Sequence, residues 1–394
     1  MGAGPKPENL RIHLEFQVKI RKNHMEKAIK AQARTFNLAD WDVFFLGGAS
    51  ILSCLGVLIF VDRASVYVAS KIAFGLAFAI NHPHFLSSYM LLYGDFRKKI
   101  FSNWRYMWSA IGAPALLAGI LIYSFASGNT LWIGHTLNAM FFLVGWHYVK
   151  QVFGCVIVTS ARRRIFYQPM ERKMILANLF SLWALSFSQG QIGSASFQFY
   201  GITYSGLGFS RTIVPFLYAA IAATFLGMAA MHVRKYKREG ILPSAPGLAA
   251  LATLYVWYLP AFSHPAYAYF IPMFHSLQYL VFVWSFKKNQ VAATPDSRWM
   301  RDFVGYGAMA LMLGAISFEF LPKFLDSQKL LHNPALGTSP FLAGILIFIN
   351  IHHYFIDNTI WRNNNEQVKK YLFAPTPVNA TKPQPAEKPA LKAA

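Results

Sequence analysis

Long runs of apolar residues, separated by short clusters of charge, constrain this chain more than any other feature. A helix needs about 20 predominantly apolar residues to cross a bilayer. Segments of roughly that kind occur at 43–61, 66–94, 106–124, 131–158, 174–189, 212–232, 246–262, 264–286, 303–321 and 340–361. They predict an all-α fold, a polytopic integral membrane bundle of about ten transmembrane helices. The charged share of the chain is 13%, about half that of an average soluble domain, which argues against a soluble enzyme.

The positive charge of the chain follows the same division into spans and loops. Lys and Arg number 37 against 16 Asp and Glu, a net charge of +21. They gather before the first predicted span and in every even-numbered loop, for example at 97–99, 162–164 and 234–238. Cytoplasmic loops carry such an excess, so we expect both termini in the cytoplasm and a multi-pass protein of a bacterial inner membrane, plasma membrane or equivalent. Anionic lipid then accounts for the charge, and no nucleic-acid partner is needed.

Three regions follow from these patterns. Residues 1–40 form a basic cytoplasmic N-terminal segment, 41–362 the transmembrane domain, and 363–394 a cytoplasmic tail. The tail is rich in Pro, Ala and Lys from about residue 374, a composition typical of disorder. The stretch 189–211 is rich in Gly, Ser and aromatics and predicts a structured external loop or a re-entrant segment.

Six of the twelve histidines lie deep inside apolar sequence, in four of the even-numbered spans. They are His82, His84, His147, His275, His352 and His353. The next basic residues toward the cytoplasm are Arg97, Arg162, Lys287 and Arg362. At about 1.5 Å per residue, these spacings place the six imidazoles within roughly 9 Å of one depth, in the inner half of the bilayer. Ionisable groups inside a membrane tend to mark functional sites, and imidazole is the commonest transition-metal ligand, so all six are predicted metal ligands. For any single histidine the alternative is a hydrogen bond to a neighbouring helix.

Two charged residues share these spans and are predicted to take part in catalysis. Asp357 follows His353 by four residues, which places both on one helix face; the alternative is a pair between Asp357 and Arg362. Lys150 lies inside the span of His147. It is predicted to pair with Asp95 or Asp357, or to bind an anionic head group.

The donor set indicates which metal to expect. Nitrogen ligands with few carboxylates and no thiolate cluster suit iron, copper or zinc. A structural zinc would add little to a bundle that folds without it, so iron is the first expectation, mononuclear or di-iron. Copper, zinc and haem b remain alternatives, although no CxxCH attachment motif is present.

The arrangement of HPH, single His and adjacent HH at one depth resembles the integral-membrane non-haem iron oxygenases. That group includes the histidine-box desaturases and hydroxylases, and the bacterial dioxygenases that cleave carotene. The resemblance covers six residues and a general architecture, and the HxxxH and HxxHH boxes of desaturases are absent. It implies a metal-dependent membrane oxidoreductase that uses O2 to hydroxylate, desaturate or cleave a lipophilic substrate, with an electron-donor protein as partner.

Three other functions remain open from the sequence. Two facing histidines suit a bis-histidine haem protein that transfers electrons. A His, Lys and Asp relay suits a transporter, although the repeats typical of transporters are not evident. A membrane transferase could use one histidine as general base on a lipid substrate.

Overall fold

The computed structural model describes residues 41–60, 62–193, 196–261, 270–331, 333–362 and 364–373, and nearly all of these are helical. The α-helices are α2 (Trp41–Val43), α3 (Ala49–Phe60), α4 (Arg63–Met90), α5 (Trp104–Met107), α6 (Ala113–Ser127), α7 (Thr130–Arg162), α8 (Pro169–Gln189), α9 (Val214–Glu239), α10 (Ala245–Ala261), α11 (Phe270–Ala292), α12 (Gly305–Ala315), α13 (Leu321–Ser327), α14 (Pro340–Ile360) and α15 (Glu366–Leu372). Single π-helical turns join α2 to α3, α5 to α6 and α12 to α13 into continuous helices.

Six of these continuous helices are long and apolar enough to cross a membrane, which indicates a membrane protein. They are Trp41–Phe60, Trp104–Ser127, Thr130–Arg162, Arg211–Glu239, Met300–Ser327 and Pro340–Ile360. The other four predicted spans fall largely on α4, α8, α10 and α11, which are helical but outside that set. Within α10 the apolar stretch is shorter, and α8 and α11 carry charged residues near one end, such as Arg172 and Lys287.

Local sequence explains where the helices begin and end. The side chain of Asp62 accepts a hydrogen bond from the backbone N–H of Ser65 and caps α4. Asn129 caps α7 in the same way, through the N–H of Trp132. Short polar side chains before the first turn satisfy donors that the helix leaves free. Gly128 ends α6 at a φ of 66°, a left-handed conformation that glycine adopts without strain.

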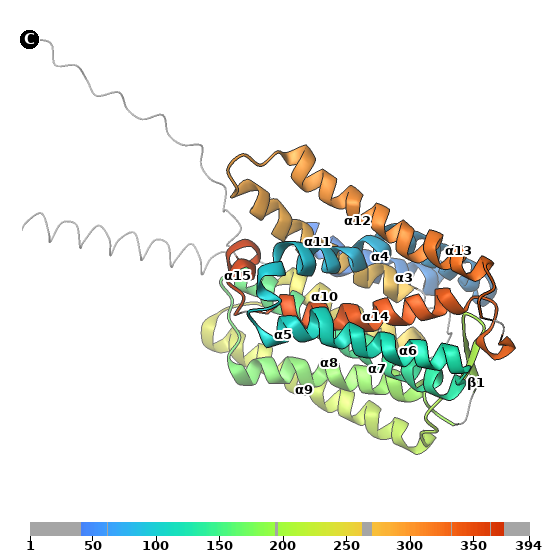
Figure 1. Ribbon diagram of the computed structural model, residues 1–394. Coiled ribbons are helices and arrows are strands. Elements are labelled where there is room, and N and C mark those ends of the chain that lie inside the picture. The colour runs from blue at the N-terminus through green and yellow to red at the C-terminus, as the bar shows by residue number, and fades with distance from the viewer. Residues whose placement is uncertain are drawn as a thin grey trace, which may run out of the picture.

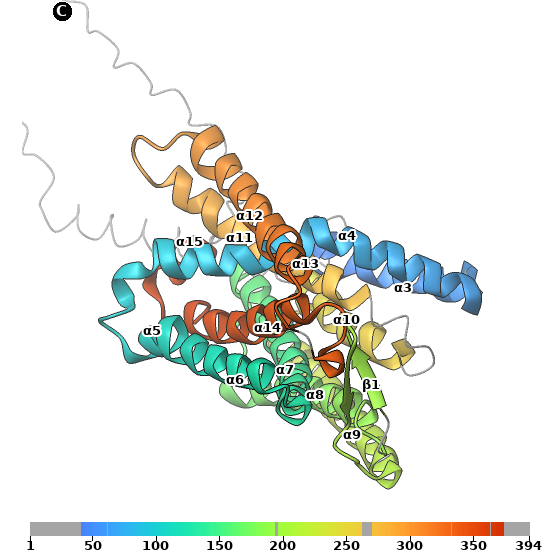
Figure 2. The ribbon, with the colours of Figure 1, turned by 45° about the vertical axis from the view of Figure 1, so that its right-hand side comes forward.

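The helices form a bundle of two groups with α14 and α10 between them (Figures 1 and 2). One group holds α3, α4, α11, α12 and α13, and the other holds α6, α7, α8 and α9. Helix α14 contacts α4, α6 and α7, and α11 packs against α4. Large apolar side chains on the outer faces are exposed, for example Phe216 and Leu226 on α9. Such exposure suits a lipid environment rather than water.

Two elements close the ends of the bundle. The strands β1 (Ser196–Phe199) and β2 (Ile202–Ser205) pair antiparallel at one end, so the part of 189–211 that is described is a structured loop. At the opposite end α15 buries Val368 and Leu372 and packs against α11 (Figure 1). The predicted tail therefore begins with an ordered helix. The predicted segment 1–40 and the tail from residue 374 lie outside the described residues.

Candidate metal centre

Four of the six predicted histidines meet in the interior, one from each of four helices. His84 comes from α4, His147 from α7, His275 from α11 and His353 from α14. One ligand nitrogen of each lies within 4.8 Å of the others, and all four residues are buried. Two nitrogens on one ion at bonds of about 2.1 Å lie at most about 4.2 Å apart. Small side-chain rotations therefore suffice for all four to hold one metal ion.

The four imidazole rings form a closed square. Ring centroids lie 4.8 Å apart for His84 and His275, 5.0 Å for His275 and His147, 4.9 Å for His147 and His353, and 4.4 Å for His353 and His84. Each neighbouring pair is close to perpendicular. Four rings arranged edge to face in this way can aim one nitrogen each at a shared centre.

His82 lies outside this cluster, because of the geometry of its helix. Residues two apart on an α-helix point roughly 200° from one another, so His82 and His84 cannot face the same neighbour while α4 continues through Pro83. The His82 ring instead stacks on Phe318 at a centroid distance of 4.3 Å. It belongs to the packing of α4 against the helix that begins at Met300.

His352 also lies outside the cluster, about 100° around α14 from His353. Its Nδ1 lies 2.8 Å from the hydroxyl of Tyr89, and its Nε2 lies 2.7 Å from the carbonyl oxygen of Ser109. A carbonyl oxygen only accepts, so Nε2 carries the proton and Nδ1 accepts from Tyr89. Both nitrogens are therefore occupied, and His352 has no lone pair left for a metal.

The hydrogen bonds of Ser276 fix the tautomer of His84. Ser276 donates its one proton to Oδ1 of Asn81, 2.5 Å away. Its oxygen lies 3.1 Å from Nδ1 of His84, so it accepts the Nδ1 proton of that ring. The lone pair of His84 is then on Nε2, which has no hydrogen-bond partner in the described part of the chain. Metal-bound histidines usually donate their second nitrogen in this manner.

Unsatisfied nitrogens recur at every member of the cluster. Within the described residues, Nε2 of His84, Nε2 of His147, Nδ1 of His275 and both nitrogens of His353 are buried without a hydrogen bond. Nδ1 of His82, outside the cluster, is a further unpaired nitrogen. Buried polar atoms are nearly always paired, and each exception calls for an explanation such as a missing ion. One orphaned nitrogen from each of four neighbouring rings is the donor set that a metal ion needs.

Asp357 adds a carboxylate at one edge of the square. Its Oδ2 lies 3.2 Å from Nε2 of His353 and 3.7 Å from Nε2 of His147. Its Oδ1 accepts hydrogen bonds from the hydroxyls of Ser88 and Tyr279, at 2.8 and 2.9 Å. Oδ1 is therefore anchored, and Oδ2 is free to bind a metal or to accept from a ligand histidine. The alternative pair with Arg362 is not formed, since Nε of Arg362 donates to the carbonyl of Asn358.

Lys150 does not join the site. Its side chain is exposed, with Nζ over the rings of Trp146 and Phe180 at 5.7 and 5.9 Å. Of its two predicted partners, Asp95 pairs with Lys287 instead. The structure thus places Lys150 apart from the four histidines, while its catalytic role and the transporter relay stay untested predictions.

The sequence did not show which residues contact the ligand histidines across helices. Ser276 and Asn81 act on His84 as described above. Gln151 donates to the backbone carbonyl of His275 at 2.8 Å and ties α7 to α11. One signal was available for the first pair, because Asn81 lies three residues before His84 on the same face of α4. The contact between α4 and α11 was not visible in the sequence.

The arrangement suits a small ion better than a haem. A bis-histidine haem needs its two imidazoles on opposite faces of a wide planar macrocycle. Among the described residues, each ring already has two neighbouring histidine rings at centroid distances of 4.4 to 5.0 Å, and these rings occupy the space that a macrocycle would need. Four neutral imidazoles with one carboxylate nearby are a donor set for iron, copper or zinc.

No protein family model, no curated protein and no solved structure matches this chain. Its function has to be inferred from the geometry of the four-histidine cluster and from the apolar helices around it.

Proposed function

We propose that this chain is an integral membrane oxidoreductase whose four-histidine centre binds iron and uses O2 on a lipophilic substrate. The observation that carries the proposal is the set of orphaned imidazole nitrogens on His84, His147, His275 and His353. Leaving several buried nitrogens unpaired costs free energy in the folded protein, and a bound cation would recover it.

The surroundings of the site favour redox iron over structural zinc. The four helices pack through large apolar contacts of their own, so a metal is not needed to hold them together. Iron supplies the capacity to bind and activate O2, while the protein fixes ligand geometry and excludes water. Two tyrosines pack against the histidine rings. The ring centroids lie 4.1 Å apart for Tyr148 and His275, and 4.7 Å apart for Tyr354 and His147.

The proposed substrate class follows from the position of the four-histidine centre among apolar helices. A centre enclosed by apolar helices is accessible to a molecule that partitions into the bilayer, and less so to a charged metabolite. Three reaction types fit. Oxidative cleavage of a double bond uses both atoms of O2 and needs no further electrons. Hydroxylation and desaturation also need two electrons and two protons, so those reactions require an electron-donor protein.

The proposal includes a topology of ten spans with both termini in the cytoplasm. Its support is the alternation of basic and uncharged loops. The centre would then lie in the inner half of the bilayer of a bacterial inner membrane, plasma membrane or equivalent.

Metal analysis of the purified protein tests the centre, with controls supplied by neighbouring histidines. We expect about one iron per chain in the wild type and in His352→Ala and His82→Ala, because the two latter side chains lie outside the cluster. His353→Ala and His84→Ala should lose most of the metal, since a structural or catalytic site rarely tolerates loss of a direct ligand. Equal metal content in all four variants, or wild-type protein without stoichiometric metal, would overturn the proposal.

A second measurement separates the metal from its chemistry. Copper bound at the same four histidines would keep the centre and its capacity to react with O2 but would reject iron. Zinc, which has no redox chemistry, would keep the centre and reject the oxygenase function. An absorption spectrum of the same sample would reveal a haem by its Soret band, and such a band would contradict the close packing of the four rings.

A further inference from the structure

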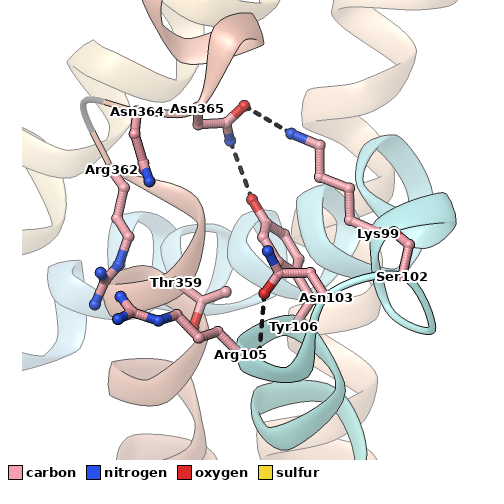
Figure 3. A pocket seen from close by; sticks show the side chains of 9 residues that line it. All are labelled: Lys99, Ser102, Asn103, Arg105, Tyr106, Thr359, Arg362, Asn364 and Asn365. Carbon is pink, nitrogen blue, oxygen red and sulfur yellow. Dashed lines mark hydrogen bonds between the residues drawn. The ribbon is translucent and has the colours of Figure 1, made fainter.

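A polar cavity of about 250 Å³ lies at the end of the bundle where α14 ends and α5 begins (Figure 3). Its charged lining residues are all cations, namely Lys99, Arg105 and Arg362. Asn103, Asn364 and Asn365 add amide groups. None of the residues that line this cavity belongs to the four-histidine cluster.

The three cations have no acidic partner among the residues that the structure describes. Nζ of Lys99 donates to Oδ1 of Asn365 at 3.0 Å, and Nε of Arg362 donates to a backbone carbonyl. Three positive charges around one cavity repel one another, and a bound anion would reduce that repulsion.

Asn365 holds one of these cations in place. It is only 5% exposed, and its Nδ2 donates to the hydroxyl of Tyr106 and the carbonyl of Ile360 at 3.2 and 3.1 Å. Its Oδ1 therefore points at Lys99, as Figure 3 shows. The position of the ammonium group is thus built into the fold.

A second cavity, of about 330 Å³, adjoins the first and is different in character. Arg105, Thr359 and Arg362 line both cavities. Beyond them the second cavity is lined by the aromatic residues Trp104, Trp108 and Phe355, together with the polar residues Ser109 and Asn358. Trp104 is 68% exposed and Trp108 43% exposed, and tryptophan collects at the level of lipid head groups in membrane proteins.

We propose that the two cavities together form a binding site for an anionic phospholipid. The phosphate would lie among Lys99, Arg105 and Arg362, and an acyl chain would lie along Trp104, Trp108 and Phe355. A polar cationic hollow that continues into an aromatic groove matches an amphiphile with an anionic head, and basic pockets beside membrane helices bind such head groups. Arginine suits a phosphate especially well, because its planar group donates two parallel hydrogen bonds. This site is independent of the proposed metal chemistry.

Native mass spectrometry of the detergent-solubilised protein tests the proposal. Dioleoyl phosphatidylglycerol should bind as one tight equivalent, and dioleoyl phosphatidylcholine, which has the same chains, should not compete with it. In the double variant Arg105→Gln and Arg362→Gln, the affinity for phosphatidylglycerol should fall by roughly 30-fold. The matched control is Arg234→Gln with Lys237→Gln, which removes two exposed cations of α9 that line neither cavity.

Two outcomes would overturn the inference. Equal loss of phosphatidylglycerol binding in both double variants would mean that the effect is general charge attraction. Binding of inorganic phosphate that displaces phosphatidylglycerol at similar concentration, with no gain from the acyl chain, would mean a site for free phosphate. If the double variant does not fold, the single variant Arg105→Gln, in an exposed side chain, and the lipid comparison on wild-type protein decide the point.

Discussion

The Oδ2 atom of Asp357 lies 3.2 Å from Nε2 of His353, one helical turn earlier on α14. The carboxylate is 6% exposed, and among the described residues its ion-pair partners are the two histidines His353 and His147, with no Lys or Arg. A buried carboxylate without a cation is costly. A metal ion held by the four histidines would supply that positive charge, which links Asp357 to the affinity of the centre.

Replacing Asp357 with Asn should weaken metal binding while preserving the fold. The amide oxygen can still accept from Ser88 and Tyr279, as Oδ1 does now, but the negative charge is gone. Residues that support metal ligands typically contribute 10- to 100-fold in affinity, so we expect a loss of about that size. Competition with a chelator of known affinity measures it.

The matched control for this prediction is Asp95→Asn. Asp95 is paired with Lys287 at 3.1 Å, outside the four-histidine cluster, so its substitution should leave metal affinity unchanged. Equal affinity in Asp357→Asn and wild-type protein would show that the carboxylate neither binds nor supports the metal.

Ser276→Ala should weaken the same centre through His84. The substitution removes the oxygen that accepts the Nδ1 proton of His84, so the ring loses its fixed tautomer and orientation. We expect metal affinity to fall by about 10-fold, measured by the same chelator competition. Ser124→Ala is the control, because the buried hydroxyl of Ser124 donates to the carbonyl of Ile120 in its own helix and, among the described residues, has no bond to the cluster. If the two serine variants bind metal alike, the orienting role of Ser276 is wrong.

Much of the fold was predictable because each span is a local pattern. The apolar run 131–158 became α7 (Thr130–Arg162), with Asn129 as its cap, and 340–361 became α14 (Pro340–Ile360). Helix α15 was missed, because seven residues carry too weak a signal without the surface of α11 that buries Val368 and Leu372. The ten-span count stays a prediction, with six helices now identified as long and apolar enough.

The site was half visible in the sequence. The distance along each helix from a histidine to the next basic loop selected four helices, and one histidine from each of them lies in the cluster. The position of a residue along a helix also fixes the direction in which its side chain points. This direction differs between His84 and His82, and between His353 and His352. A local sequence pattern does not show which residue on another helix forms a hydrogen bond with each histidine. Examples are Ser276 for His84 and Ser109 for His352.

Gly314 is expected to set how closely α12 approaches α4. A methyl group at this position would lie 2.7 Å from Cβ of His82 and 3.1 Å from its carbonyl carbon. Gly314→Ala should therefore destabilise the protein by about 1–3 kcal/mol, as overpacking does, and lower its Tm in detergent. Gly307→Ala on the same helix meets no atom within 4 Å and should be neutral or slightly stabilising. Equal Tm values for the two variants would contradict this close packing.

Removing the metal should lower the stability of the wild-type protein, because among the described residues one nitrogen or more of each cluster histidine and Oδ2 of Asp357 are then buried without a hydrogen bond. A ligand that binds only the folded state, present at 100 times its Kd, stabilises by about 2.7 kcal/mol. Adding Fe²⁺ without oxygen to the metal-free protein should therefore raise its Tm by several degrees. His353→Ala, which lacks one ligand, should show little response, and His352→Ala should respond like the wild type, since its nitrogens are already bonded to Tyr89 and Ser109. A metal-independent Tm in the wild type, or the same response in both histidine variants, would mean that the four rings do not bind the ion.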